Sequence, residues 1–212
     1  MKIGIIGSGV VAKTLGSGFI KHGHDVMLGT RDPSKLEEWK NNEEKARVGN
    51  FKETASFGEI IILAVKGTAA VEALNQLDEE SISGKTIIDT TNPIADSPPE
   101  NGVLKFFTTL DKSLMEELQE KFPNVNFVKA FNSIGSASMV NPDFKEKPTM
   151  FICGNNQVSK DQVTKILKDF GFEVEDMGKA NAARAIEPLC MLWCIPGFLK
   201  NNWNHAFKLL KK

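Results

Sequence analysis

The chain has 212 residues, of which 41% are hydrophobic and 25% are charged, so it can bury a core and is neither disordered, collagen-like nor a coiled coil. At about 150 residues per domain this length predicts one large domain with a modest extension and leaves no room for separate full cofactor and substrate domains. The 26 Lys and Arg residues against 27 Asp and Glu residues give a formal net charge of -1, which disfavours nucleic-acid binding.

Short apolar runs alternate with segments of helical periodicity along almost the whole chain. Strands are predicted at residues 2–6, 25–29, 47–51, 59–65, 85–89, 126–131, 149–153 (at a sheet edge) and 172–177. Helices are predicted at residues 10–21, 34–44, 69–77, 112–121 and 159–170. This alternation is typical of parallel strands joined by crossover helices. We therefore expect an α/β protein with a Rossmann-type, doubly wound, mostly parallel sheet of about eight strands.

The end of the chain is predicted to form a helical tail. We place the nucleotide-binding domain at residues 1–182 and the tail at residues 183–212, broken at Pro196-Gly197. The most apolar stretch, residues 189–199, is shorter than the roughly 18 residues that a membrane span requires, so we expect no membrane contact. Its aromatic side chains predict a homodimer, with packing in the core as the alternative.

Residues 7–12, with the sequence Gly7-Ser8-Gly9-Val10-Val11-Ala12, follow the first predicted strand and open the first predicted helix. This is a GxGxxA fingerprint. The first glycine permits a tight turn, the second lets the backbone approach a pyrophosphate, and the alanine lets the helix pack closely on the strand. The helix N-terminus supplies N–H groups and a positive dipole. The pattern predicts a dinucleotide site, with a purely structural turn as the alternative.

The end of the second predicted strand indicates which dinucleotide binds. Thr30 occupies the place where an NAD enzyme usually offers a carboxylate to the ribose, and Arg31 follows it. A guanidinium there can form charge-assisted hydrogen bonds to a 2'-phosphate, and Lys35 can add a point charge. These residues favour NADP(H); solvated surface charges are the alternative.

Other candidates lie where the later strands end. These residues are Ala64, Val65, Lys66 and Gly67, then Asn92 and Pro93, and finally Asn132. Because ligands of open α/β sheets bind outside the carboxyl ends of the strands, we expect these residues to line the nicotinamide and second-substrate side. Ordinary loop structure is the alternative for any one of them. The long loop at residues 90–110 is of the kind that is usually functional.

The sequence offers no catalytic or metal-binding residues. It has no nucleophile elbow, no HExxH motif and no zinc-type Cys/His spacing. The histidines, and the pair Cys190 and Cys194, are interpreted as structural, and Asp89 as a cap of the loop after its strand. Three cysteines without a disulfide or metal pattern fit a reducing compartment, so we expect a cytoplasmic protein.

Together these segments resemble the NADPH-dependent deazaflavin (coenzyme F-420) reductases, and they are similar to the cytosolic oxidoreductase domain of the six-transmembrane metalloreductases. The resemblance covers residues 2 to about 190. Its specific pieces are Gly7-Ser8-Gly9, Gly29-Thr30-Arg31, Val128-Lys129-Ala130-Phe131-Asn132, Ile152-Cys153-Gly154 and Asp176-Met177-Gly178. The loop at residues 94–107 matches no pattern of the family.

The resemblance implies a function. It implies that Ser8 to Val11 hold the diphosphate, that Thr30, Arg31 and Lys35 hold the 2'-phosphate, and that residues 65–67, 92–93 and 132–136, including Ser136, approach the nicotinamide and its partner. It implies hydride transfer between NADP(H) and a flavin or deazaflavin, a small-molecule acceptor that brings its own reactive ring. The alternatives are an NADPH-dependent reductase of a small carbonyl or imine, and a non-catalytic NADPH-binding redox sensor.

Overall fold

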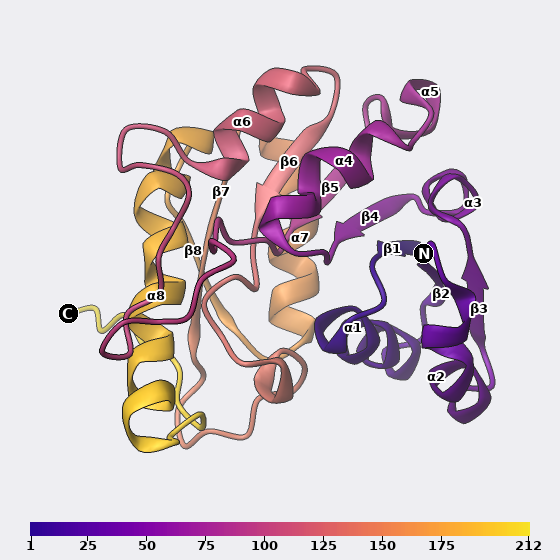
Figure 1. Ribbon diagram of the computed structural model, residues 1–212. Helices are drawn as coiled ribbons and strands as arrows, with labels where there is room; N and C mark the ends of the chain where they lie inside the picture. The colour runs from indigo at the N-terminus through magenta and orange to yellow at the C-terminus, as the bar shows by residue number, and fades with distance from the viewer.

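Figure 1 shows a computed structural model that describes all residues from Met1 to Lys212. Its centre is one eight-stranded sheet in the order β3-β2-β1-β4-β5-β6-β7-β8, which fans from β3 on the right of the view to β8 on the left. The strands are β1 (Lys2–Ile6), β2 (Asp25–Gly29), β3 (Ala46–Gly49), β4 (Ile60–Leu63), β5 (Thr86–Asp89), β6 (Asn126–Lys129), β7 (Thr149–Gly154) and β8 (Glu173–Asp176). Strands β1 to β6 are parallel, β7 runs antiparallel to β6, and β8 is parallel to β7. The predicted doubly wound α/β fold is confirmed.

Helices cover both faces of this sheet. They are α1 (Val10–Lys21), α2 (Glu37–Asn42), α3 (Phe51–Phe57), α4 (Ala70–Asn75), α5 (Glu79–Ile82), α6 (Leu114–Lys121), α7 (Gln157–Asp169) and α8 (Ala183–Lys200), with short 3-10 turns η1 (Pro33–Leu36), η2 (Gly67–Ala69), η3 (Ser136–Ser138) and η4 (Ala180–Ala182). Side chains alternate across a strand, so Ile60 and Ile62 of β4 join the core under α1 and α7, while Ile61 and Leu63 join the core under α3, α4 and α6.

Two of the predicted elements need correction. The strand predicted at residues 47–51 ends at Gly49, because Asn50 caps α3: its Oδ1 accepts the N–H of Glu53 at 2.9 Å, and its own N–H donates to Glu53 Oε2 at 2.8 Å. The strand predicted at residues 149–153 as an edge strand is internal, because β7 pairs with β6 on one side and with β8 on the other. The edge of the sheet is β8.

The predicted break at Pro196-Gly197 is wrong, because α8 continues through Pro188 and Pro196 to Lys200. Packing of Ile186 and Trp193 in the interior outweighs the local cost of the prolines. With the turn before it, the helical segment Ala180–Lys200 is long and apolar enough to cross a membrane by length and composition alone, and 33% of its most apolar window is buried. The helix is thus longer than the apolar stretch at residues 189–199 that the sequence indicated.

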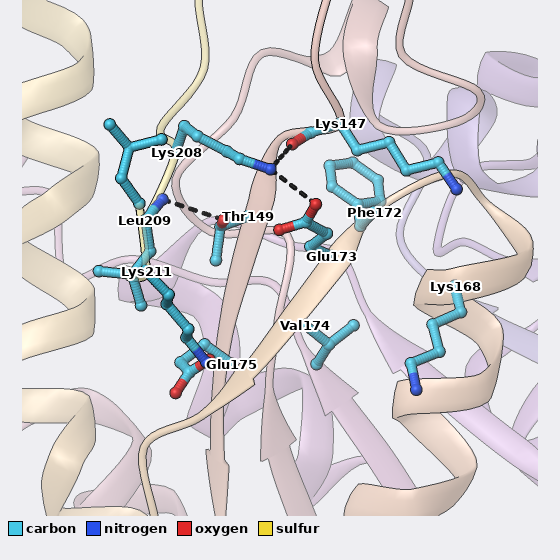
Figure 2. Close-up of a pocket in the computed structure, with 11 residues that line it drawn as sticks. Lys147, Thr149, Lys168, Phe172, Glu173, Val174, Glu175, Lys208, Leu209 and Lys211 are labelled. Atoms are coloured by element: carbon cyan, nitrogen blue, oxygen red, sulfur yellow. Dashed lines mark hydrogen bonds and ion pairs between the residues drawn. The ribbon is translucent and has the colours of Figure 1, made fainter.

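Residues 201–212 form an extended tail that crosses β7 (Figure 2), so the predicted helical tail is helical only as far as Lys200. The N–H of Thr149 donates to the carbonyl of Phe207 at 2.9 Å, and the N–H of Leu209 donates to Thr149 Oγ1 at 3.1 Å. Lys208 pairs with Glu173 of β8 at 2.7 Å. The tail is thus tied to β7 and to the edge strand β8.

Candidate nucleotide-binding site

The fingerprint loop joins β1 to α1 in the conformation that its glycines permit. Gly7 has a φ of +143°, and a Cβ at this position would overlap the carbonyl oxygen of Ala64. Its N–H donates to the carbonyl of Gly29 at 2.9 Å, which ties the loop to β2. Glycine has no Cβ, so it adopts this positive φ without strain and leaves room for the carbonyl of Ala64 at the end of β4.

The N-terminus of α1 is open. Gly9 is its N-cap residue, no side chain caps the helix, and its first turn has no acidic residue. A Cβ on Gly9 would meet no atom within 4 Å. The first N–H groups of a helix have no partner within the helix, and they carry the positive end of its dipole. This cradle of free backbone donors therefore fits the diphosphate of a dinucleotide.

A cleft of about 500 Å³ opens from this helix end across the carboxyl ends of β4 and β5. It is lined by Gly9, Val10, Val11, Ala64, Val65, Lys66, Gly67, Thr90, Thr91, Asn92, Ile94, Ala95, Asp96 and Ser97. The cleft lies where the strand order reverses between β1 and β4, which is the place where open α/β sheets bind ligands. Eight of these residues were predicted from the sequence. Thr90, Thr91 and the start of the loop at residues 94–97 complete the wall.

The predicted phosphate-binding residues lie at the end of β2. Thr30 is buried, and its Oγ1 accepts the N–H of Asp32 at 3.1 Å. Asp32 caps η1, because its Oδ1 accepts the N–H of Ser34 at 3.2 Å. The same oxygen accepts the hydroxyl of Ser34 at 2.6 Å, and this hydrogen bond lowers the pKa of Asp32. Arg31 and Lys35 are exposed, and their side chains make no hydrogen bond or ion pair. Their charges are therefore available to a 2'-phosphate.

Some predicted residues act from behind the cleft or lie beside it. Asn132 is buried and does not line the cleft, but its Nδ2 donates to Asn92 Oδ1 at 3.2 Å and to the carbonyl of Ile186 at 2.9 Å. Asn92 Nδ2 donates in turn to the carbonyl of Asn132 at 2.8 Å. Pro93 is buried next to Asn92, and Ser136 lies on η3, which packs against α1. Ser8 is half-buried in the fingerprint loop.

The acid and base groups that line the cleft are Lys66 and Asp96. They lie at its mouth, both more than two-thirds exposed, with Lys66 Nζ 3.6 Å from Asp96 Oδ1. Cys190 and Cys194 do not line the cleft, and their interaction one turn apart on α8 raises the pKa of Cys190 and lowers that of Cys194. His205 Nε2 donates to the carbonyl of Trp193 at 2.9 Å, and the His205 ring stacks on the Trp193 ring. Cys190, Cys194 and His205 thus lie outside the cleft.

Sequence reasoning missed a buried cluster of three charges behind the cleft, formed by Asp89, Lys129 and Glu187. Lys129 Nζ lies 2.7 Å from Asp89 Oδ2 and 2.9 Å from Glu187 Oε1, and all three side chains are buried. Asp89 also caps the following loop, as predicted, because its Oδ1 accepts the N–H of Thr91 at 2.9 Å. A lysine inside an otherwise apolar strand was the one available signal, since a buried lysine requires a partner.

A larger hollow of about 720 Å³ lies elsewhere, between β8 and the C-terminal tail (Figure 2). It contains none of the predicted site residues. Its two carboxylates, on Glu173 and Glu175, already pair with Lys208 and Lys211 of the tail. We therefore assign the nucleotide site to the smaller cleft.

Comparison with known proteins agrees with this geometry. Residues 2–93 match the family model described as NADP oxidoreductase, coenzyme F420-dependent. Metalloreductase STEAP3 of Rattus norvegicus is 28% identical over 202 residues, which are 93% of this chain and 39% of that protein. F420-dependent NADP reductase of Methanocaldococcus jannaschii is 25% identical over 142 residues, which are 66% of this chain and 63% of the relative. The chain thus spans less than two thirds of the length of either relative.

Solved structures extend the likeness to the whole chain. A structure from Arthrobacter sp. FB24, assigned as an F420-dependent NADP reductase, superposes with a TM-score of 0.93 at 28% identity and covers 100% of both chains. The imine reductase of Streptomyces aurantiacus gives a TM-score of 0.71 at 15% identity, over 94% of this chain and 63% of that one, which shows a shared fold. Residues 2–93 are therefore similar to the F420-dependent NADP oxidoreductase family, and the relatives of the chain are NADP-dependent oxidoreductases.

Proposed function

We propose that this protein transfers hydride between NADP(H) and a flavin or deazaflavin. One observation carries the proposal: the uncapped N-terminus of α1 opens into the same 500 Å³ cleft as the ends of β4 and β5, and that cleft is lined mostly by backbone and small side chains. Such a site can hold a dinucleotide along its length and leave a surface on which a second flat ring can stack.

The residues of the chain divide the binding between them. The N–H groups at the start of α1 hold the diphosphate, and Arg31 and Lys35 hold the 2'-phosphate. Asn92, fixed by Asn132, offers an amide at the ring end of the cleft. The chemistry that bound NADPH supplies is hydride donation to the acceptor, which receives two electrons and a hydrogen nucleus and leaves NADP⁺. Because hydride transfer is direct, the protein has to orient two rings and exclude water, and it needs no acid or base.

In this proposal the acceptor binds against the loop at residues 94–97, which lines the same cleft as the start of α1. A panel of flavins, deazaflavins, small ketones and imines, each with NADPH, tests the proposal by following the loss of NADPH absorbance. We expect turnover with the ring acceptors. Turnover with ketones or imines alone would favour the carbonyl and imine alternative, and tight NADPH binding with no turnover would favour a redox sensor.

Arg31→Ala tests the choice of cofactor. We expect the affinity for NADPH to fall by roughly 10- to 150-fold, since one or more charged hydrogen bonds are lost, while the affinity for NADH stays nearly constant. Calorimetric titration measures both. Arg47→Ala is the matched control, because Arg47 is an exposed arginine on β3 that packs over the ring of Phe57 at 5.2 Å. Equal losses for NADPH and NADH would contradict the phosphate assignment.

A further inference from the structure

The buried charge cluster of Asp89, Lys129 and Glu187 joins four elements behind the cleft. Asp89 ends β5, Lys129 ends β6, and Glu187 lies on α8, while the two oxygens of Glu187 accept the N–H groups of Leu114 and Met115 at the start of α6, both at 3.0 Å. Burying ions costs free energy, and replacing such a group by apolar side chains is often neutral or stabilising. Stability alone therefore gives no reason for this cluster.

The buried charge cluster carries a net charge. Each carboxylate is surrounded by donors: Asp89 by Lys129 and by the N–H and hydroxyl of Thr91, and Glu187 by Lys129 and the first N–H groups of α6. Burial alone would lower the pKa of Lys129, but the two carboxylates outweigh it, so that its pKa is raised and it stays charged. Two negative charges and one positive charge leave one net negative charge, which the dipole of α6 offsets only in part.

Thr91 connects this charge to the cleft. It lines the cleft, and its carbonyl accepts a hydrogen bond from Lys129 Nζ at 2.8 Å. Thr91 thus lies between the buried charge cluster and the cleft. Cys153, which pairs with Lys129 in the sheet register, adds no charge, because burial raises its pKa to about 12. The other charges nearby, Lys66 and Asp96, are exposed at the mouth and balance each other.

We propose that the buried charge cluster sets the preference of the cleft for oxidised over reduced cofactor. This inference rests on the proposed function. The nicotinamide ring is positively charged in NADP⁺ and neutral in NADPH, so a net negative charge behind the cleft wall stabilises the oxidised form and the positive charge that develops as hydride leaves. The size of this change in relative affinity depends on the distance between the cluster and the ring and on the local dielectric constant.

Glu187→Gln tests the proposal, because it removes one charge and keeps the shape of the side chain. We expect the ratio of dissociation constants, NADP⁺ over NADPH, to rise at least threefold, measured by calorimetric titration without any acceptor. Glu116→Gln is the matched control: Glu116 lies on α6 and pairs with Arg184 of α8, so it links the same two helices without touching Lys129. The control is expected to leave the ratio unchanged.

A merely structural role predicts a different result, because weaker packing lowers both affinities together. An unchanged ratio in folded Glu187→Gln therefore overturns the proposal. Asp89→Asn removes the other negative charge and is expected to shift the ratio in the same direction. If neither variant folds, the wild type decides: it should bind NADP⁺ at least as tightly as NADPH, and tenfold tighter binding of NADPH contradicts the proposal.

The two proposals can fail separately. A shifted ratio with no turnover on any acceptor supports the electrostatic role and overturns the proposed hydride transfer. Turnover of a flavin or deazaflavin with an unchanged ratio of dissociation constants supports the proposed hydride transfer and overturns the electrostatic role. A wild type that binds neither form of the cofactor overturns both.

Discussion

At the scale of single residues, the two fingerprint glycines have different tasks. Gly7 has a positive φ and no space for a side chain, because the carbonyl of Ala64 occupies that position. Gly9 has a φ of -78° and faces open space. The first glycine is therefore required by the folded chain itself, and the second by the ligand that approaches it.

Exchanging each glycine for alanine separates these tasks. We expect Gly7→Ala to lower the free energy of unfolding by about 1–3 kcal/mol through backbone strain. Gly9→Ala should change it by less than about 0.5 kcal/mol, yet weaken NADPH binding because a methyl group then stands in the diphosphate cradle. Urea unfolding and calorimetric titration measure the two effects. A destabilised Gly9→Ala with intact binding would contradict this division.

Residue chemistry also limits what could be predicted from the sequence. The fingerprint, Arg31 and the strand-end residues were accessible because each belongs to a local pattern. The partners of Lys129 were not, since Glu187 comes from α8 and no spacing relates it to β6. Asn132 was predicted at the site, but its role in fixing Asn92 depends on two side chains meeting across neighbouring strand ends.

At the scale of elements, the strands of the sheet centre were predictable because β1, β4 and β5 each contain consecutive apolar residues buried on both faces of the sheet. The predicted bounds were wrong where a capping residue was overlooked or where packing outweighed a local signal. The Asn50 capping box starts α3 where a strand was expected to continue. Prolines predicted a break in α8, but burial of one side of the helix against the sheet holds it together.

The pairing of α6 with α8 yields a test that depends on pH. Arg184 donates to both carboxylate oxygens of Glu116, through Nη2 at 2.7 Å and Nε at 2.9 Å, and holds the pKa of Glu116 at about 2. Because the folded pKa is below the unfolded one, this stabilisation is present above about pH 4.5 and is lost as the pH falls toward 2. The pair lies partly in solvent, so its contribution is about 0.5–1 kcal/mol.

Arg184→Met should therefore lower the free energy of unfolding by about 0.5–1 kcal/mol at pH 7. The difference in stability between the variant and the wild type should shrink below pH 4.5, where Glu116 becomes protonated in the unfolded chain. Urea unfolding across this range measures it. Lys52→Met, which breaks an exposed pair with Asp78 at 2.8 Å, is the control and should have the smaller effect. A deficit that is constant down to pH 2 would show that Arg184 acts through packing and not through its charge.

At the scale of the whole molecule, apolar side chains remain exposed along α8 and the start of the tail. They are Leu192, Phe198, Leu199 and Trp203. Leu192 and Leu199 are seven residues apart and so share a face of the helix. We propose that a second copy of the chain covers this face, since a continuous exposed apolar stripe is typical of an interface.

Light scattering at micromolar concentration should then give twice the monomer mass, and Leu199→Lys should give the monomer. Val158→Lys is the control, because Val158 is equally exposed on α7, away from α8. A monomeric wild type at tens of micromolar would exclude the homodimer. The same side chains would then remain an apolar surface without a partner in solution.

The sequence separation within the buried charge cluster bears on the order in which the protein folds. Glu187 binds the first turn of α6 from 73 residues further along the chain. Contacts between distant segments are expected late, because closing a long loop costs entropy before the contact offsets it. Until α8 docks, Asp89 and Lys129 stay hydrated at the end of the sheet. The space behind the cleft therefore acquires the charge of Glu187 only once α8 has docked.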